Sequence, residues 1–251
     1  VLFHSADGRL WLYYKYGPSP SDWVAARRFS VDEGRTWSPV EHLPAGLLGP
    51  IRAKPLLLAN GVLVSGTSVE AYHAWSIWVE RSTDSGATWT TIGPIPLAAG
   101  SAIHPPLPDG REGLIQPSVV RVGKDHLRLY ARSTQDIGRI CVADSFDEGL
   151  HWSAARPLDV PNPNSGIDAV ALKDGRVVLV YNDSTTARSP LNVAVSHDGE
   201  HFRNLMTLES EPGEFSYPAI IQESGGDLDI TYTWNRKSIA FVHIPLAEVP
   251  R

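Results

Sequence analysis

The stretch Ser145-Phe-Asp-Glu-Gly-Leu-His-Trp152 decides how this chain folds, because the chain repeats it. Three other stretches follow the pattern S-x-D-x-G-x-T/H-W or a shortened form of it: residues 30–37, 82–89 and 196–202. The aspartate of such a stretch can accept the N–H groups of a tight turn, and the glycine supplies a positive φ. The aromatic residue can pack back onto the sheet. Each copy therefore predicts a β-hairpin, which we call an Asp-turn.

The spacing of the Asp-turns indicates a repeat architecture. They begin at residues 30, 82, 145 and 196, so successive copies lie 52, 63 and 51 residues apart. A second turn signal, with glycine between two apolar runs, precedes each copy by roughly 22 residues, which makes two hairpins per repeat. A fifth such signal at Gly225-Gly226 has no Asp-turn after it. The last repeat is therefore predicted to lack its outer strand.

These repeats predict an all-β fold, a β-propeller of four-stranded antiparallel blades in a single domain that spans residues 1–251. We expect the blades at about residues 1–48, 49–100, 101–160, 161–212 and 213–251. In a propeller, the segments that lead into each first strand and the loops from second to third strands gather at one end of the axis. The function is therefore expected in residues that do not repeat.

The composition excludes several classes of partner. The net charge is −6 and the basic residues are scattered, so no stripe suited to nucleic acid is present. No run approaches 18 apolar residues, so we expect no membrane insertion. Cys141 is the only cysteine and lies in an apolar run, which predicts a buried, inert thiol. His104 stands alone, and neither a metal site nor any other cofactor is expected.

The chain opens in mid-strand at Val1, without an initiating Met and without a signal peptide. We expect a further N-terminal blade to precede it in the whole protein. The cellular location and the oligomeric state are not predicted by the sequence.

Three segments are similar to those of the sialidase (neuraminidase) superfamily of Asp-box, or BNR-repeat, proteins. Leu129-Tyr-Ala-Arg-Ser133 resembles the segment that carries the second carboxylate-binding arginine, and this implies that role for Arg132. The segment 182–196 resembles the one that carries the third arginine, which matches Arg188. Phe215-Ser-Tyr-Pro-Ala219 resembles the motif of the nucleophilic tyrosine, which matches Tyr217. The resemblance covers most of the chain and implies a six-bladed parent, with about five blades visible here.

The implied roles agree with physical chemistry. Arginine presents a rigid fork of donors that holds a sugar carboxylate in a defined orientation. An anionic nucleophile would be repelled by the carboxylate at the anomeric centre, whereas a neutral tyrosine with a nearby base would not. The implied partner is an acidic glycan or oligosaccharide.

The chain also departs from the family pattern. Gln116 stands where sialidases have the glutamate that helps to deprotonate the tyrosine, and an amide cannot accept that proton. The F/Y-R-I-P motif with the first arginine, and the aspartate acid/base that follows it, are both missing from the sequence.

Other residues could complete the site. Asp168 is a candidate catalytic carboxylate, although it could equally cap a turn, and Glu70 and Glu214 are alternatives. Arg52, Lys54 and Arg236 could add positive charge, or pair with surface acids instead. Trp75 and Trp234 could stack on sugar faces or merely cover the edge of the core.

The sequence thus supports three hypotheses. The first is an exo-acting glycoside hydrolase specific for a terminal acidic sugar, with Tyr217 at the anomeric centre and Arg132 and Arg188 on the carboxylate. The second, motivated by Gln116, is another acidic-glycan hydrolase or a polysaccharide lyase. The third is a non-catalytic carbohydrate-binding propeller.

Overall fold

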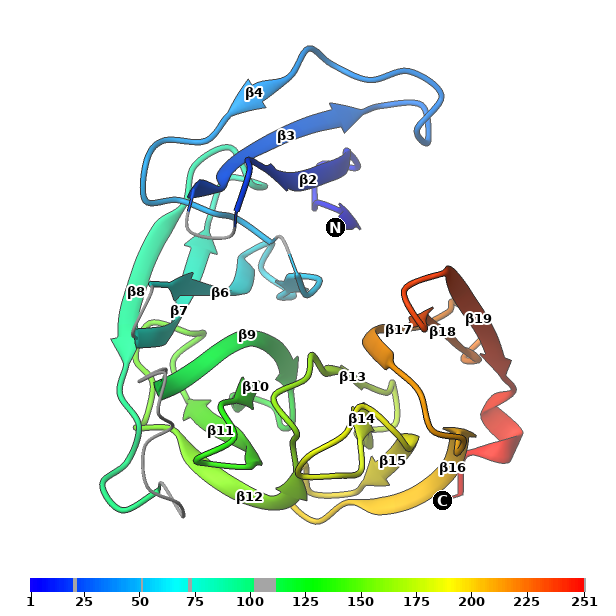
Figure 1. Cartoon of the computed structure of the whole chain (residues 1–251). Coiled ribbons are helices and arrows are strands. Elements are labelled where there is room, and N and C mark those ends of the chain that lie inside the picture. The colour runs from blue at the N-terminus through cyan, green and yellow to red at the C-terminus, as the bar shows by residue number, and fades with distance from the viewer. Residues whose placement is uncertain (20–21, 51, 72–73, 102–111, 251) are drawn as a thin grey trace.

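A computed structural model describes residues 1–19, 22–50, 52–71, 74–101 and 112–250. The strands form five consecutive antiparallel groups, here called sheets 1 to 5, which follow one another around an arc (Figure 1). The prediction of an all-β fold with four-stranded antiparallel sheets is confirmed. A short 3₁₀ segment, Leu246–Glu248, follows the last strand.

The strands have the following bounds. Sheet 1 contains β1 (Leu2–His4), β2 (Leu10–Tyr16), β3 (Val24–Ser30) and β4 (Glu41–His42). Sheet 2 contains β5 (Leu56–Leu57), β6 (Leu63–Glu70), β7 (Ala74–Ser82) and β8 (Thr90–Ile95). Sheet 3 contains β9 (Glu112–Arg121), β10 (Leu127–Ser133), β11 (Arg139–Ser145) and β12 (Arg156–Pro161). Sheet 4 contains β13 (Asp168–Ala171), β14 (Val177–Asn182), β15 (Leu191–Ser196) and β16 (Arg203–Glu209). Sheet 5 contains β17 (Phe215–Gln222), β18 (Leu228–Trp234) and β19 (Ser238–Ile244).

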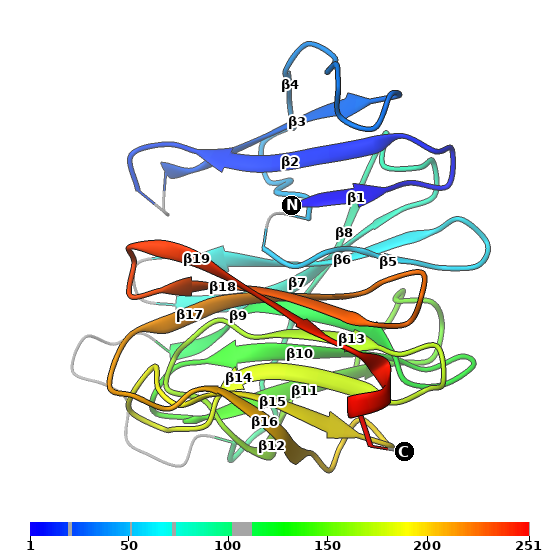
Figure 2. The ribbon, with the colours of Figure 1, turned by 90° about the vertical axis from the view of Figure 1, so that its right-hand side faces the viewer.

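The arc is open between sheets 1 and 5 (Figure 1). Seen from this open side, β1 and β2 lie above β17 to β19 (Figure 2), and no strand pairing between described residues joins the two sheets. A closed propeller therefore stays a prediction. Sheet 5 has three strands, as the missing fifth Asp-turn predicted. Sheets 2 and 3 are continuous, because β7 and β9 pair in parallel at Trp75 and Gly113.

The Asp-turns connect the third and fourth strands, and their hydrogen bonds explain the repeated pattern. The Asp147 carboxylate accepts the N–H of His151 at 2.9 Å and the hydroxyl of Ser145 at 2.9 Å, and it also contacts the His151 ring. The Ser145 hydroxyl in turn accepts the N–H of Gly149 at 3.0 Å. The turns around Asp32 and Asp84 repeat these bonds with a threonine hydroxyl in place of the histidine ring. The T/H position is thus a second donor to the aspartate.

Apolar clusters hold each sheet to its neighbours. Buried side chains form one cluster between sheets 1 and 2, one between sheets 2 and 3, one between sheets 3 and 4, and one between sheets 4 and 5. Cys141 lies in the second of these clusters, fully buried as predicted, and burial raises the pKa of its thiol to about 12. Within the described part of the chain, no helix has the length and apolar character that crossing a membrane requires.

Sheets 2 and 3 also approach closely where β6 passes β9. A Cβ added at Gly66 would lie 2.3 Å from the Pro117 carbonyl oxygen, which is backbone and cannot move aside cheaply. Pro117 directly follows Gln116, a predicted site residue. The narrow space between β6 and β9 therefore requires a glycine at position 66. This contact also holds the segment of β9 that contains Gln116.

We expect Gly66→Ala to destabilise the protein by about 1–3 kcal/mol or more, as overpacking a tight contact does. Gly225→Ala is the matched control, because nothing lies within 4 Å of its added Cβ and its φ is not positive. That control should change stability by less than about 0.5 kcal/mol. Urea unfolding of both variants measures the difference, and equal stabilities would contradict the close approach of β6 and β9.

Candidate functional site

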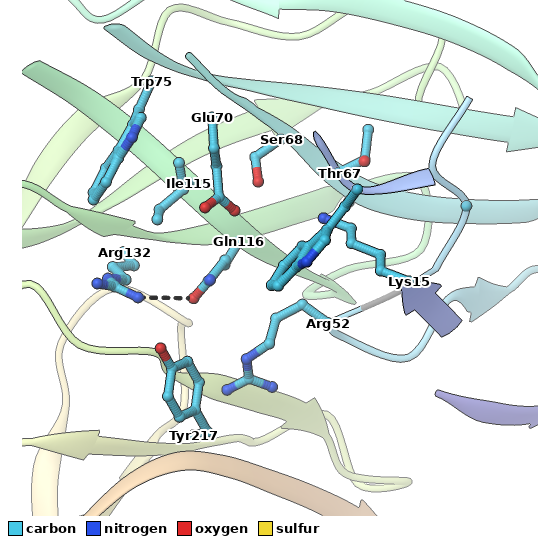
Figure 3. Close-up of a pocket in the computed structure, with 13 residues that line it drawn as sticks. Lys15, Arg52, Thr67, Ser68, Glu70, Trp75, Ile115, Gln116, Arg132 and Tyr217 are labelled. Atoms are coloured by element: carbon cyan, nitrogen blue, oxygen red, sulfur yellow. Dashed lines mark hydrogen bonds between the residues drawn. The ribbon is translucent and has the colours of Figure 1, made fainter. Parts of the chain in front are cut away.

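A cavity of about 440 Å³ opens where sheets 1, 2, 3 and 5 meet (Figure 3). Its lining includes side chains from strands and loops of all four sheets, and those that carry charge, an amide or a phenol are Lys15, Arg52, Glu70, Gln116, Arg132 and Tyr217. Glu70 is the one carboxylate among the described residues that line it. Three of the described lining side chains, Lys15, Arg52 and Arg132, are therefore cationic, whereas one is anionic.

The structure brings together five of the predicted site residues in this lining: Arg52, Glu70, Gln116, Arg132 and Tyr217. Four others do not line it: Lys54, Asp168, Arg188 and Arg236. Of the two tryptophans considered for stacking, Trp75 lines the cavity, whereas Trp234 packs near Phe215 with the ring centres 6.5 Å apart. His104 lies outside the described residues.

Gln116 and Tyr217 share the same unusual backbone conformation. Each lies at a β-bulge, where β9 or β17 contains one residue more than its partner strand. Gln116 has φ 56° and Tyr217 has φ 53°, and a proline follows each of them. Left-handed backbone is uncommon outside glycine, and a following proline favours extended backbone instead. This local strain turns both side chains toward the cavity.

Arg132 is fixed in place by two amide side chains. Its Nε donates to Asn164 Oδ1 at 2.8 Å, and its Nη1 donates to Gln116 Oε1 at 3.2 Å. Trp75 lies against it, with the guanidinium carbon 5.6 Å from the centre of the indole ring. Figure 3 shows the bond to Gln116 and, beside it, the phenol oxygen of Tyr217 pointing toward the same pair. Amide partners, unlike carboxylates, leave the charge of Arg132 unneutralised.

Tyr217 is surrounded by guanidinium groups. The guanidinium carbons of Arg52 and Arg188 lie 5.5 and 5.6 Å from the centre of its ring. Burial alone would raise the pKa of the Tyr217 phenol, but the positive charges of Arg132 and Arg188 outweigh burial, and the pKa falls below its ordinary value. The phenol is therefore easier to ionise than that of an ordinary tyrosine.

Arg188 is placed behind Tyr217 by a chain of ion pairs. Its Nη1 donates to Glu214 Oε1 at 2.8 Å, and the other oxygen of Glu214 accepts from Arg236 Nε at 2.7 Å. Burial would raise the pKa of Glu214, but these two arginines hold it below its usual range. Glu214 is thus occupied as an ion-pair partner, and the side chain of Arg236 is 72% exposed.

Asp168 does not line the cavity, and its carboxylate connects segments of four sheets. Its carboxylate accepts from Lys54 Nζ at 2.9 Å, from the Ser118 hydroxyl at 2.7 Å and from the Ile220 N–H at 3.0 Å. Its side chain is only 3% exposed. All three of these hydrogen-bond partners are donors from the protein itself. Lys54 donates to Asp168 and does not line the cavity.

Sequence reasoning missed Lys15, Trp23, Thr67 and Ser68, which also line the cavity. Lys15 ends the second strand of sheet 1 and Trp23 precedes the third strand. The rule that second-to-third-strand loops reach the site could have identified both. Asn164 was also missed, although it lies in a segment expected to face the cavity.

No histidine or cysteine occurs among the described residues of the cavity lining. Glu223, Asp229 and His243 on sheet 5 have ligand atoms close enough to hold a metal ion, but none of the three lines the cavity. The described lining thus offers no ligand set typical of a transition metal.

The Asp-turn hairpins and the arc of antiparallel sheets define a sialidase-like, BNR-repeat fold. The chain belongs to the family described as BNR repeat-like domain, whose model matches residues 1–230.

Solved structures of known proteins share this fold at low sequence identity. NanB sialidase from Streptococcus pneumoniae is 17% identical with a TM-score of 0.68, and the match covers 90% of this chain and 36% of that one. Trypanosoma rangeli sialidase is 16% identical with a TM-score of 0.67, covering 96% of this chain and 43% of that one. A protein of unknown function from Dyadobacter fermentans is 16% identical with a TM-score of 0.72, covering 93% and 71%. The chain thus spans less than half of either sialidase. No curated protein matches it.

We expect Asp168→Asn to lower the free energy of unfolding by roughly 3 kcal/mol, because it breaks a buried ion pair. Asp159→Asn is the control, since Asp159 pairs with Arg139 but its side chain is 98% exposed, and its loss should cost less than about 1 kcal/mol. Chemical denaturation measures both. Full stability of Asp168→Asn combined with loss of activity would instead indicate a chemical role for this carboxylate.

The phenol of Tyr217 should ionise below the ordinary tyrosine range, and Arg188→Gln should raise its pKa because one of the positive charges that stabilise the phenolate is removed. Carbon-13 NMR of labelled tyrosine rings over a pH series follows this, with Tyr217→Phe identifying the signal. The surface variant Arg9→Gln should leave the titration unchanged. An unshifted curve for Tyr217 in Arg188→Gln would show that Arg188 does not act on the phenol.

Proposed function

We propose that this protein is an exo-acting glycoside hydrolase that removes a terminal acidic sugar, either sialic acid or a related carboxylated sugar. One observation carries the proposal: guanidinium groups from three different sheets surround the phenol of Tyr217 beside a cavity whose described lining includes a single carboxylate. On this proposal the five sheets are blades of a β-propeller, and the cavity lies at the end of its axis.

The substrate carboxylate is held by Arg132 together with Arg52. Two nitrogens of Arg132 are engaged by Asn164 and Gln116, and its guanidinium also hydrogen-bonds the phenol of Tyr217, so a carboxylate bound by Arg132 lies next to that phenol. Arg52 is anchored by the Pro218 carbonyl at 3.0 Å and keeps its other terminal nitrogen. Arg188 lies behind the phenol and acts mainly on Tyr217. A carboxylate between fixed forks of donors is bound in one orientation, so the sugar is oriented as well.

Tyr217 is the nucleophile in this proposal. The oxygen of the neutral phenol attacks the anomeric carbon and passes its proton to solvent as the bond forms, which the nearby guanidinium groups favour, so no free anion approaches the substrate carboxylate. The bond from this carbon to the glycosidic oxygen breaks, and the departing oxygen takes a proton from Glu70. Water then attacks the anomeric carbon, its proton passes to Glu70, and the phenolate leaves and takes a proton back from solvent. The cycle ends with hydrolysed glycoside and unchanged protein.

Glu70 has this proton-transfer role because of its position. It ends β6, lines the cavity, and points between Trp75 and Gln116 toward the centre (Figure 3). Gln116 cannot transfer a proton as a carboxylate does, so it serves as the partner that orients Arg132.

The surroundings of the Tyr217 hydroxyl favour a polysaccharide lyase as a second candidate function. No hydrogen bond from the Tyr217 hydroxyl to a carboxylate occurs within the described part of the chain, so Tyr217 has no base of its own. A lyase needs a tyrosine that removes a ring proton next to a carboxylate neutralised by arginine, and it needs no water. The lyase product would contain a carbon–carbon double bond that absorbs ultraviolet light, whereas the hydrolase product would not.

We expect the protein to release methylumbelliferone from a methylumbelliferyl glycoside of either N-acetylneuraminic acid or glucuronic acid. Tyr217→Phe should lower kcat by at least about 10³-fold, because the nucleophile is lost. Tyr14→Phe is the control, since Tyr14 does not line the cavity, and it should keep wild-type turnover. Fluorescence reports hydrolysis, and ultraviolet absorbance of digested uronic-acid oligosaccharides reports the lyase reaction. Binding of these sugars without turnover of either kind would leave the protein as a carbohydrate-binding module.

A further inference from the structure

A second cavity of about 320 Å³ adjoins the first one. The two cavities share four lining residues, Lys15, Trp23, Ser68 and Glu70, and the second one adds Leu48 and Val69 among others. These shared residues mark the junction between the two cavities, and Glu70 is the one carboxylate among them. Ligand cavities usually measure roughly 300–1,000 Å³, so the second cavity has room for about one additional sugar ring.

Two residues of sheet 1 give the second cavity its chemistry. Trp23 is 37% exposed, so part of its indole ring is accessible from the cavity. The Lys15 ammonium lies 5.2 Å from the centre of the Trp23 ring. Aromatic rings commonly bind sugars through the apolar face of the sugar ring, and an adjacent cation can reach a substituent of that ring.

The Lys15 ammonium has no hydrogen bond or ion pair to any described residue. Its nearest carboxylates, Glu70 and Glu80, act on it only at longer range. Glu80 is fully buried and its two oxygens accept the N–H groups of Leu48 and Gly49, so it is committed to holding the loop behind the cavity. Burial lowers the pKa of Lys15 despite these carboxylates, which indicates that the protein compensates its charge incompletely.

We propose that the second cavity binds the sugar next to the terminal one and recognises an anionic group on it, a sulfate or a carboxylate, through Lys15, while Trp23 stacks on the sugar ring. This inference rests on the proposed function, because the terminal acidic sugar occupies the first cavity. It places the glycosidic bond at the junction beside Glu70. The preferred substrate is then a glycan with two neighbouring anionic sugars.

The test uses two pairs of probes that differ only in a sulfate on the second sugar. One pair is 3′-sialyllactose with and without a 6-sulfate on galactose, and the other is glucuronyl-N-acetylgalactosamine with and without a 6-sulfate. Calorimetry on the Tyr217→Phe variant measures binding without turnover. The sulfated member of the pair that binds should bind at least about tenfold more tightly, as expected for one charge-assisted contact, and this advantage should shrink as salt is added.

Lys15→Met removes the charge but keeps a side chain over Trp23. It should bring the affinity ratio between sulfated and unsulfated probes close to one. Lys124→Met, in the β9–β10 turn far from both cavities in sequence and fold, should keep the wild-type ratio. If Lys15→Met does not fold, as judged by circular dichroism, Lys15→Gln replaces it.

The inference is overturned if the wild-type cavity binds both members of a pair equally, or if Lys15→Met keeps the preference for sulfate. Either result would leave the proposed hydrolysis of the terminal sugar intact. A preference for sulfate that depends on Lys15, without turnover of any acidic glycoside by the unmutated protein, would instead support the second cavity and overturn the catalytic proposal. Absence of binding by all four probes would overturn both.

Discussion

The buried carboxylate of Asp168 is the interaction on which the rest of the structure depends. It begins β13 in sheet 4, and its partners are Lys54 of the segment before β5, Ser118 of β9 and the backbone of Ile220 in β17. One side chain therefore joins the innermost parts of four sheets. A carboxylate can do this because it offers about four lone-pair directions and carries a charge that only donors can satisfy. Apolar contacts between the sheets provide most of the buried area but no such fixed register.

The candidate site is connected directly to the residues around Asp168. The Ile167 carbonyl precedes Asp168 and the Pro218 carbonyl follows Tyr217, and both accept hydrogen bonds from Arg52. Among the described non-glycine residues, those with left-handed backbone outside the turns and hairpins are Gln116, Asn164 and Tyr217, and all three contact Arg132. Regular strands hold the sheets together, while irregular backbone points side chains at one another. This is the distribution expected when a scaffold stabilises strain at a functional site.

The sequence predicted the elements that repeat and predicted less well what the repeats place together. The four Asp-turns gave the hairpins, the sheet boundaries and the three-stranded last sheet, because each depends on bonds within a few residues, such as those of Asp147. Arg132 and Tyr217 were found by resemblance and do line the cavity. Asp168 and Lys54 could not be separated from the lining residues by sequence, because their orientation depends on partners 50 or more residues away. Lys15 and Trp23 belong to no motif, and only their place beside the loop between the second and third strands of sheet 1 could have pointed to them.

The charge of the cavity lining is opposite in sign to the net charge of the chain. The chain as a whole has a net charge of −6, which disfavours general adhesion to acidic glycans. The cavity concentrates Arg52, Arg132 and Lys15 around Glu70, and the oxygen partners of Arg132 are amides instead of carboxylates. Gln116 therefore has an electrostatic consequence as well as a chemical one: a glutamate in its place would neutralise Arg132 and weaken the attraction for an anionic ligand. By keeping an amide there, the chain preserves uncompensated positive charge in the cavity although its net charge is negative, and on the proposed function this charge favours binding of the acidic sugar.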